Sequence, residues 1–400
     1  MKRPLAKDTI AMKTPRPRRA WVIDRRSRGQ ALVVFALALV AIVAGVGLVL
    51  DGGNAYAQER VTQNGADAAA NAGAVVLAQR LGGATKTDAD VAAGVDAITS
   101  SPEYAFSSHT GYYTNLVGQK LDAAGNIAAN SGQPPALVGG GTIPTGAQGV
   151  QVDGGRTFGT SFSRVVGISS MGAGATATAV TGRLVGGPLL PIVFPVNVAD
   201  CENNGSLGPG QDEWPLSADG TPHPQGQEYI VPLCKTGSGS FQILDLDGTK
   251  NNCADEVTNP PAIQFDLPTW IDTDNGNNCA KQMVDAVNAL HGTVVLIPIC
   301  DGGNGAPQSV TCGTAGGSNG QYHIIKVAGF FVDYMSDSNN PNNSECKNTT
   351  SPSYGTSITP IFGNGSTSCL TGWFVKYITQ GPVGAGDVTG SDAIGIQLIR

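Results

Sequence analysis

The strongest constraint in this sequence is an unbroken apolar run close to the N-terminus. Residues 31–50, ALVVFALALVAIVAGVGLVL, contain no charge, amide or hydroxyl group. A helix rises about 1.5 Å per residue, so a run of this length covers the roughly 30 Å hydrocarbon core of a bilayer. The run is therefore predicted to be a transmembrane helix that crosses the membrane once.

The charges around this run predict its orientation. The first 28 residues carry ten Lys or Arg against two Asp, whereas the rest of the chain carries 14 basic and 29 acidic residues. Basic residues beside a first transmembrane helix are retained in the cytoplasm. Residues 1–30 are therefore expected to form a cytoplasmic tail. The helix after it is expected to lie in the cytoplasmic (inner) membrane, and the C-terminal part is expected to be extracytoplasmic. The tail has no nucleic-acid-binding fold around it, and no nucleic-acid partner is predicted.

A cleavable signal peptide is the alternative interpretation of the same segment. Ala55-Tyr56-Ala57 fits the small-x-small site that signal peptidase prefers. However, the apolar run is longer than the roughly 7 to 15 residues typical of such signals. Asp51 and Asn54 also separate the run from the cleavage site. Retention of the anchor is therefore favoured.

The residues after the run predict a continuous helix. No Pro occurs between Ala55 and Leu81, and Gly82-Gly83 supplies a stop, so one helix is expected from Gln30 to Leu81. A short capped helix is expected over 87–101. Residues 51–101 are accordingly interpreted as an Ala-rich helical stalk. Its small or apolar positions recur every three to four residues and predict one face, made of Ala57, Val61, Gly65, Ala68, Ala72 and Val76.

The remaining composition indicates strands and loops. The chain has 55 Gly and 24 Pro, and only 14% of its residues are charged. Residues 102–147 are interpreted as a linker, 148–187 as a strand region and 188–400 as a Cys-containing extracytoplasmic domain. Within that domain a helix is expected over 280–290 and strands over 293–299, 322–335 and 373–378. The predicted fold class is a single N-terminal transmembrane helix extended into a stalk, followed by an extracytoplasmic α+β, mainly β, disulfide-containing domain.

The cysteines predict an oxidising compartment. All eight lie beyond residue 200, on the side expected to be extracytoplasmic. The C-x-x-C and Cys/His pairs typical of zinc sites are missing, so disulfides are favoured over metal. The connectivity is open, and sequential pairing is only the best single guess. The predicted bridge residues are Cys201, Cys234, Cys253, Cys279, Cys300, Cys312, Cys346 and Cys369.

Catalytic and metal-binding signatures are weak. Residues 316–320, GGSNG, match G-x-S-x-G but lie in a Gly-rich loop without the flanking strand and helix that expose a nucleophile. Residues 245–256 and 272–278 resemble calcium loops, but Gly248 stands at the fourth position, where an EF-hand needs the sixth. The four histidines, His109, His223, His291 and His323, form no metal motif. No enzyme activity, catalytic residue, metal, cofactor or small-molecule substrate is predicted.

The N-terminal segment resembles a known family. RGQALVVFALAL, leading through DGGNAYAQERVTQNGADAAANAGAVVLAQRL, is similar to the TadG-like N-terminal segment of the tight adherence (Flp pilus) assembly system. In that family a basic lead, one membrane helix, an Asp-Gly step and an ADAAA tract follow in this order. The resemblance is strong over about 55 residues and weaker in the strand region and near the C-terminus. It implies a membrane-anchored structural protein whose partners are the lipid bilayer and other Tad/Flp pilus assembly proteins.

Two departures from related proteins refine this resemblance. Prepilin-like segments are cut after a Gly and carry Glu five residues later, but the fifth residue after Gly29 is Val34. The D-x-S-x-S motif of the von Willebrand type A domain found in many TadG relatives is also missing. An uncut TadG-like anchor is therefore favoured. The alternatives are a membrane-anchored surface binding or adhesion protein unrelated to pili and, less favoured, an exported hydrolase.

Small residues in the predicted membrane helix indicate a packing face. Helices associate in lipid where small residues let their backbones approach. Ala41 and Gly45 form a small-x-x-x-small pair that Gly47 continues, and Asp67 lies on the predicted stalk. We expect these four residues to contact another membrane subunit of the assembly machinery.

The disulfide prediction can be tested by counting thiols. Each loop of 12 to 33 residues closed by sequential pairing would stabilise the fold by about 3 kcal/mol, because it restricts the unfolded chain. Labelling of denatured, unreduced protein should find few or no free thiols. Eight reactive thiols would contradict both the disulfides and the extracytoplasmic placement.

Overall fold

The chain forms a long N-terminal helix followed by a mostly strand-rich part. The computed structural model describes residues 27–195, 229–233, 243–274, 276–301, 320–336, 368–388 and 392–399. Two compact units are present, one made of residues 1–56 and 158–171 and the other of residues 57–157 and 172–400. The second unit contains two six-stranded sheets, each with its own core.

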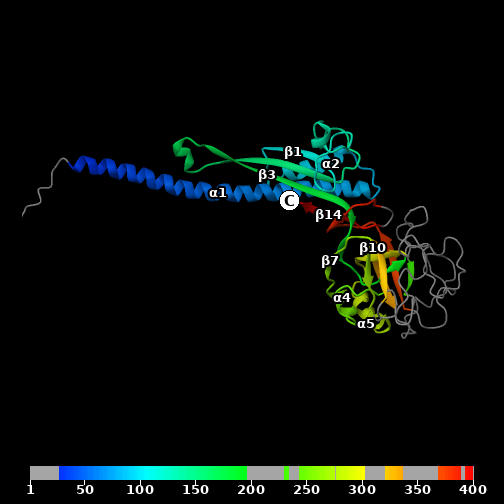
Figure 1. Cartoon of the computed structure of the whole chain (residues 1–400). Helices are drawn as coiled ribbons and strands as arrows, with labels where there is room; N and C mark the ends of the chain where they lie inside the picture. The colour runs from blue at the N-terminus through cyan, green and yellow to red at the C-terminus, as the bar shows by residue number, and fades with distance from the viewer. Residues whose placement is uncertain are drawn as a thin grey trace, which may run out of the picture. The chain divides into compact units, whose positions relative to one another are not determined.

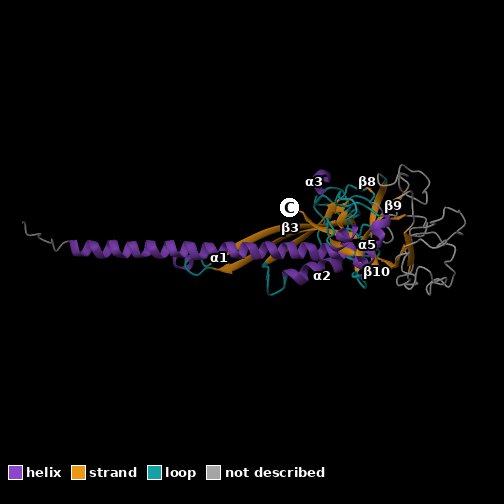
Figure 2. Ribbon diagram, turned by 90° about the horizontal axis from the view of Figure 1, so that it is seen from below, coloured by secondary structure: helices purple, strands orange, loops and turns teal. Residues whose placement is uncertain are grey.

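The first helix, α1 (Ser27–Leu81), confirms the predicted single helix over residues 30–81. It is uninterrupted across the boundary of the apolar run (Figure 2). Large side chains in the run are exposed, for example Leu32 at 72% and Phe35 at 68%. α1 is the one helix of the described chain that is long and apolar enough to cross a membrane. It is a candidate transmembrane helix and fits membrane anchoring.

The C-terminal part of α1 is packed into a hydrophobic core against the first sheet. This corrects the prediction that it forms a helical stalk. Ala66, Ala70 and Ala74 are fully buried, in one cluster with Val150 and Val152 of the first sheet. Figure 1 shows β1, β3 and β14 beside this part of α1. The helix can approach closely because its residues are small. A Cβ added at Gly73, for instance, would lie 3.0 Å from the Val150 side chain.

The buried face of α1 also differs from the predicted one. Of the predicted positions beyond Ala57, only Gly65 is buried, whereas Ala68, Ala72 and Val76 are half-buried. A Cβ at Gly94 of α2 (Asp88–Thr99) would contact Ala72 and Val76, so a second layer covers that side. Small residues occur all around this stretch, so their spacing could not single out the face against the sheet. The fully buried side chains of this stretch are those of Thr62, Ala66, Ala69, Ala70, Ala74, Leu77 and Ala78.

The first sheet has the strand order β1-β2-β3-β14-β12, with β13 (Val383–Gly384) paired to β3. Its members are β1 (Ser108–Thr114), β2 (Gly149–Gly159), β3 (Ser170–Leu184), β14 (Ile394–Ile399) and β12 (Ile378–Gln380). β14 is antiparallel to β3 and parallel to β12. The last strands of the chain therefore complete the first sheet. The predicted boundary at residue 188 is wrong for this C-terminal part, because strand pairing joins segments far apart in the sequence.

The predicted linker over 102–147 is also ordered structure. It contains β1 and the short helix α3 (Ala128–Ser131), and β1 pairs antiparallel with β2. Asp88 organises it: this carboxylate is 6% exposed and accepts hydrogen bonds from Tyr113 Oη at 2.6 Å, Gly139 N at 2.9 Å and Gly141 N at 2.7 Å. Burial and the contact with Asp88 raise the pKa of Tyr113. The Gly-rich composition of this segment gave no sign of ordered structure, because its order depends on hydrogen bonds to the distant Asp88 carboxylate.

The second sheet has the order β5-β9-β10-β11-β6, with β8 (Thr269–Asp272) paired to β10. Predicted strands are confirmed in β9 (Val294–Asp301) and β10 (Gln321–Ser336), and the predicted helix in α5 (Gly276–Asn288). The predicted strand over 373–378 is only partly right, because β11 (Ser368–Val375) ends inside it and residue 378 begins β12 of the first sheet. α5 packs Met283 and Val287 into one core with Phe330. The smaller elements are β4 (Gly186–Pro188), β5 (Phe194–Pro195), β6 (Tyr229–Leu233), α4 (Cys253–Thr258) and β7 (Ala262–Gln264).

One disulfide is described in full. Cys253 of α4 and Cys279 of α5 are bonded to one another, and both are buried in the core of the second sheet. Cys300, at the end of β9, is also disulfide-bonded. Cys201, Cys234, Cys312 and Cys346 lie outside the described residues, as does the side chain of Cys369. The pairing of these cysteines stays a prediction.

Asp88→Ala is expected to destabilise the second unit. The substitution leaves the buried Tyr113 hydroxyl and two backbone N–H groups without their acceptor, at a cost of about 2–3 kcal/mol. Urea denaturation of the detergent-solubilised full chain should show a lower midpoint. Asp96→Ala is the matched control on α2, because the Asp96 side chain is 62% exposed and pairs only with His109. Equal midpoints for the two variants would contradict the role of Asp88.

Candidate functional site

A hairpin tip packs on α1 at the end of the apolar run. We define the hairpin tip as residues 158–171, which join β2 to β3 through the 3-10 helix η1 (Ser163–Val166). Asp51 is the first residue after the run and is only 2% exposed. Its carboxylate accepts hydrogen bonds from the backbone N–H groups of Ser161 at 2.9 Å, Phe162 at 3.1 Å and Ser163 at 2.5 Å. One helix side chain therefore holds three consecutive amides of the tip.

These donors determine the charge state of Asp51. The side chain and the backbone N–H of Ser163, followed by the N–H groups of Ser161 and Phe162, lower the pKa of Asp51 to about 2, although loss of hydration opposes them. Hydrogen bonds to a carboxylate favour its ionised form. Asp51 is therefore an anion throughout the neutral range, directly beyond the apolar run.

Gly47 provides the second contact with the tip, one helical turn earlier. A Cβ at this position would lie 2.6 Å from Phe162 Cβ, so only glycine lets the tip approach this closely. Gly47 is the one buried residue between 31 and 50. The space expected to hold another subunit at Gly47 is thus occupied by Phe162 of the same chain. This corrects the predicted role of Gly47, because a side chain distant in sequence covers it.

Two of the other three predicted packing residues, Ala41 and Gly45, remain open to a partner. Ala41 is exposed, and a Cβ at Gly45 would meet no atom within 4 Å. Asp67 is half-buried and accepts a hydrogen bond from Gln63 Nε2 at 2.8 Å. Contact between these three residues and another membrane subunit stays a prediction.

Sequence reasoning missed the hairpin tip, although two signals were present. Asp51 stands at the first position after the apolar run, where a carboxylate needs either water or donors. The tip has no Asp or Glu and a single basic residue, Arg164. Neither signal shows that Asp51 and the hairpin tip contact one another, because 110 residues separate Asp51 from Ser161.

The acidic loop over 245–256 is the second candidate. Oxygen atoms of Asp245, Asp247 and Glu256 lie within 4.8 Å of one another. Lys250 Nζ lies 3.1 Å from Asp245 Oδ2 and supplies a positive charge. Glu256 accepts hydrogen bonds from the backbone N–H groups of Leu246 at 2.8 Å and Asp247 at 3.1 Å.

These contacts describe a turn closed by its own donors. Gly248 N donates to Asp245 at 2.7 Å, and Thr249 N donates to Asp247 at 2.7 Å. Burial and then repulsion from Asp247 and Asp245 raise the pKa of Glu256 to about 7, against the two backbone donors. The geometry is that of a structural turn whose carboxylates accept hydrogen bonds from the loop's own backbone. The other clustered set, Cys253, Asp274 and Cys279, contains the disulfide, so its sulfur atoms are not thiolates.

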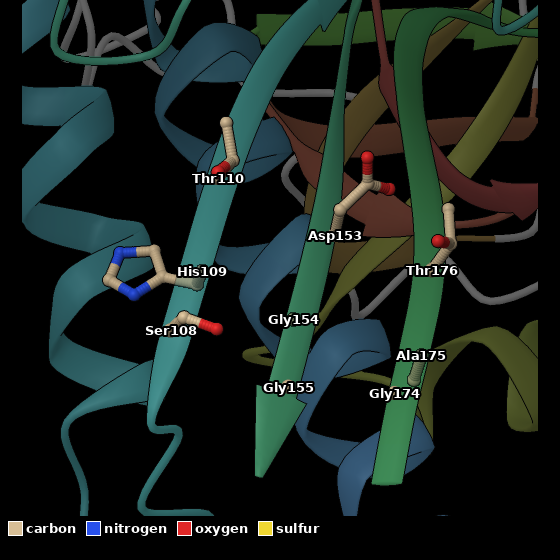
Figure 3. A pocket seen from close by; sticks show the side chains of 9 residues that line it. All are labelled: Ser108, His109, Thr110, Asp153, Gly154, Gly155, Gly174, Ala175 and Thr176. Carbon is tan, nitrogen blue, oxygen red and sulfur yellow. The ribbon is translucent and has the colours of Figure 1, made fainter. Parts of the chain in front are cut away.

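A shallow groove crosses the first sheet and is the third candidate (Figure 3). His109 and Asp153 line it from neighbouring strands, but His109 Nε2 lies 2.8 Å from Asp96 Oδ1 of α2. Asp153 lies 3.4 Å from Lys120 Nζ. The two groups are thus engaged with different neighbours and form no acid–base pair. The full lining is Ser108, His109, Thr110, Asp153, Gly154, Gly155, Gly174, Ala175 and Thr176.

Among the described residues, the remaining histidines and the G-x-S-x-G match of the sequence analysis do not form a common site. The His323 ring packs at a tilt against Trp270, with ring centroids 4.9 Å apart. His291 lies just after α5 and is exposed. His223 and residues 316–319 of the G-x-S-x-G match lie outside the described residues.

Comparison with known families singles out α1. Residues 29–76 match the Tad family, described as "Putative Flp pilus-assembly TadE/G-like". This segment is TadE/G-like. The match lies wholly within α1 and includes Gly47, Asp51 and most of the buried Ala-rich face. No curated protein and no solved structure matches the chain. The TadE/G-like segment suggests association with Flp pilus assembly and tight adherence.

Asp51→Asn is expected to loosen the hairpin tip from the TadE/G-like helix. An amide cannot serve as an anionic acceptor for all three N–H groups, so hydrogen exchange at residues 161–163 should speed up on the order of tenfold. Asp67→Asn is the matched control on α1. Unchanged exchange in Asp51→Asn would contradict the role of this carboxylate.

The pKa of Asp51 falls from 3.8 to about 2 on folding. The contribution of this carboxylate to the stability of the folded state is therefore complete above about pH 4 and is lost as pH falls through 2.

Glu256→Gln is expected to stabilise the chain at high pH. The folded pKa of about 7 exceeds the usual 4.5, so the native state binds more protons between these values and the free energy of unfolding falls as pH rises through them. Gln keeps an oxygen for the two backbone donors without the charge. The variant should gain on the order of 1 kcal/mol relative to wild type between pH 5 and pH 8 in urea denaturation. Asp255→Asn, an exposed change on α4, controls for the lost charge. A pH-independent difference would contradict this prediction.

Proposed function

We propose that this chain is a TadG-like structural component of the Flp pilus (tight adherence) assembly machinery, anchored by α1 in the cytoplasmic membrane. The observation that carries the proposal is that the TadE/G-like match coincides with the one described helix able to span a bilayer. The partners are other Tad/Flp pilus assembly proteins. A specific membrane subunit contacts α1 at Ala41 and Gly45, where the helix surface is open.

The orientation places the N-terminus in the cytoplasm and the strand-rich body outside. The ten basic residues of the first 28 support this orientation. The Cys253–Cys279 disulfide supports it from the other side of the span, because disulfides persist in oxidising compartments.

The helix has two roles in this proposal. Its apolar run anchors the chain, and its Ala-rich continuation forms the core of the first sheet. Anchor and body are thus built on one helix, without an intervening linker. Such a component positions an extracytoplasmic surface at a membrane-embedded machine. In this proposal it acts structurally and not as an enzyme.

Deletion of the chain from its host should abolish surface Flp pili, and wild-type protein should restore them. Pili would be scored by shear release, and wild-type protein would be captured in mild detergent to detect Tad components. Normal pili and adherence in the deletion strain would contradict the proposal.

The open packing face is tested separately by Gly45→Leu. This change keeps the helix apolar and leaves Gly47 free for Phe162, so the hairpin tip is undisturbed. We expect normal membrane levels with severalfold less captured Tad protein, because a large side chain prevents close helix approach. Leu48→Ile, at an exposed position of the same helix, is the control. Equal capture for both variants would show that α1 binds its partner elsewhere or acts only as an anchor.

A further inference from the structure

We propose that the hairpin tip enters the interfacial layer of the membrane beside α1, so that the chain contacts phospholipid at a second place. This inference rests on the proposed anchoring by α1. It adds a binding surface in residues 158–171, outside the segment that matches the Tad family.

The level of the tip along α1 is the first argument. Phe162 packs at Gly47, three residues before the last residue of the apolar run, and the tip amides bind Asp51, which lies just outside the run and four residues after Gly47. Four residues of helix correspond to about 6 Å along the axis. A tip held at both positions therefore straddles the boundary between the hydrocarbon and the headgroups.

The exposed chemistry of the tip fits that boundary. Phe162 is 38% exposed and Ile168 is 47% exposed, although both lie in a polar-rich turn. Arg164 is exposed, and the tip contains no acidic residue. Apolar side chains combined with a basic group are typical of segments that lie in the membrane interface, where the cation meets lipid phosphates.

The backbone of the tip is prepared for a medium with little water. Gly167 N donates to Arg164 O at 3.1 Å, and Ile168 N donates to Ser163 O at 3.0 Å. Thr160 donates twice, through its N–H to Ser169 O at 3.2 Å and through its hydroxyl to Ile168 O. Together with the three amides on Asp51, these bonds satisfy groups that would otherwise need water. Entry into the interface then costs little, because unpaired backbone groups are the main penalty there.

The burial of Asp51 gives the fourth argument. A carboxylate at the end of a membrane span normally remains charged by reaching water, but Asp51 is 2% exposed and receives protein donors instead. This arrangement keeps the anion hydrogen-bonded at the headgroup end of the span. The tip thus replaces water at the membrane boundary.

Depth-dependent fluorescence quenching tests the proposal on the full chain. The chain would be reconstituted in vesicles of phosphatidylcholine and phosphatidylglycerol, with a spin label near the top of one acyl chain. A polarity-sensitive dye would be attached to single introduced cysteines without reductant, so that the disulfides stay intact. Ile168→Cys reports on the tip, and exposed Leu48→Cys reports on the apolar run. Exposed Arg60→Cys, about 13 Å beyond Asp51 along α1, reports on the region outside.

We expect lipid quenching at residue 168 comparable with that at residue 48 and severalfold stronger than at residue 60. Adding Asp51→Asn should reduce the quenching at residue 168 severalfold and leave residue 48 unchanged. If residue 48 is quenched but residue 168 is quenched only by aqueous iodide, the anchor stands and the tip proposal is wrong. If neither quencher reaches residue 168, a second copy of the chain covers the tip, which also overturns the proposal. If residue 48 is not quenched by lipid, the membrane span itself fails, and the proposed function fails with it.

Discussion

The close packing of an Ala- and Gly-rich helix surface against a β-sheet is the constraint on which the rest of the body depends. α1 buries Ala66, Ala70 and Ala74 against Val150 and Val152, and large side chains at these helix positions would push the sheet away. The helix supplies little apolar area per residue, so stability depends on how closely the layers approach. The C-terminal strand β14 completes the same sheet, so the two ends of the folded body are stabilised together.

The buried Asp51 carboxylate, directly after the apolar run, is stabilised by hydrogen bonds from the hairpin tip. A buried anion next to a long apolar run needs hydrogen-bond donors, and the β2–β3 hairpin supplies three backbone amides. Gly47 leaves room for Phe162 at the same place. Both residues lie in the TadE/G-like segment, so that segment is a candidate membrane helix that also contacts a distant part of its own chain.

The second sheet is stabilised differently. Its core combines large aromatic and aliphatic side chains with a buried disulfide between α4 and α5. In the neighbouring acidic turn, backbone N–H groups and Lys250 contact the carboxylates. Burial of Glu256 raises its pKa. These contacts between the loop's own carboxylates, backbone donors and Lys250 account for the resemblance of its sequence to a calcium loop.

The sequence by itself determined the features that depend on local pattern. The length and composition of residues 31–50 predicted the candidate membrane helix, and alternation and apolar runs predicted β9, β10 and α5. The order of residues from the basic lead to the ADAAA tract was enough to recognise the TadE/G-like segment. Each of these signals lies within one continuous stretch, where periodicity and length carry the physical information.

Only the tertiary structure decided which surfaces are covered. Ala68 and Ala74 are chemically identical in sequence, but just Ala74 is fully buried, because the sheet lies on one side of the helix. A Gly-rich stretch became ordered through the distant carboxylate of Asp88, and the candidate packing residue Gly47 was covered by Phe162 of the same chain. These outcomes depend on contacts between residues far apart along the chain. A local pattern shows that a residue is small or charged, but the fold decides what lies against it.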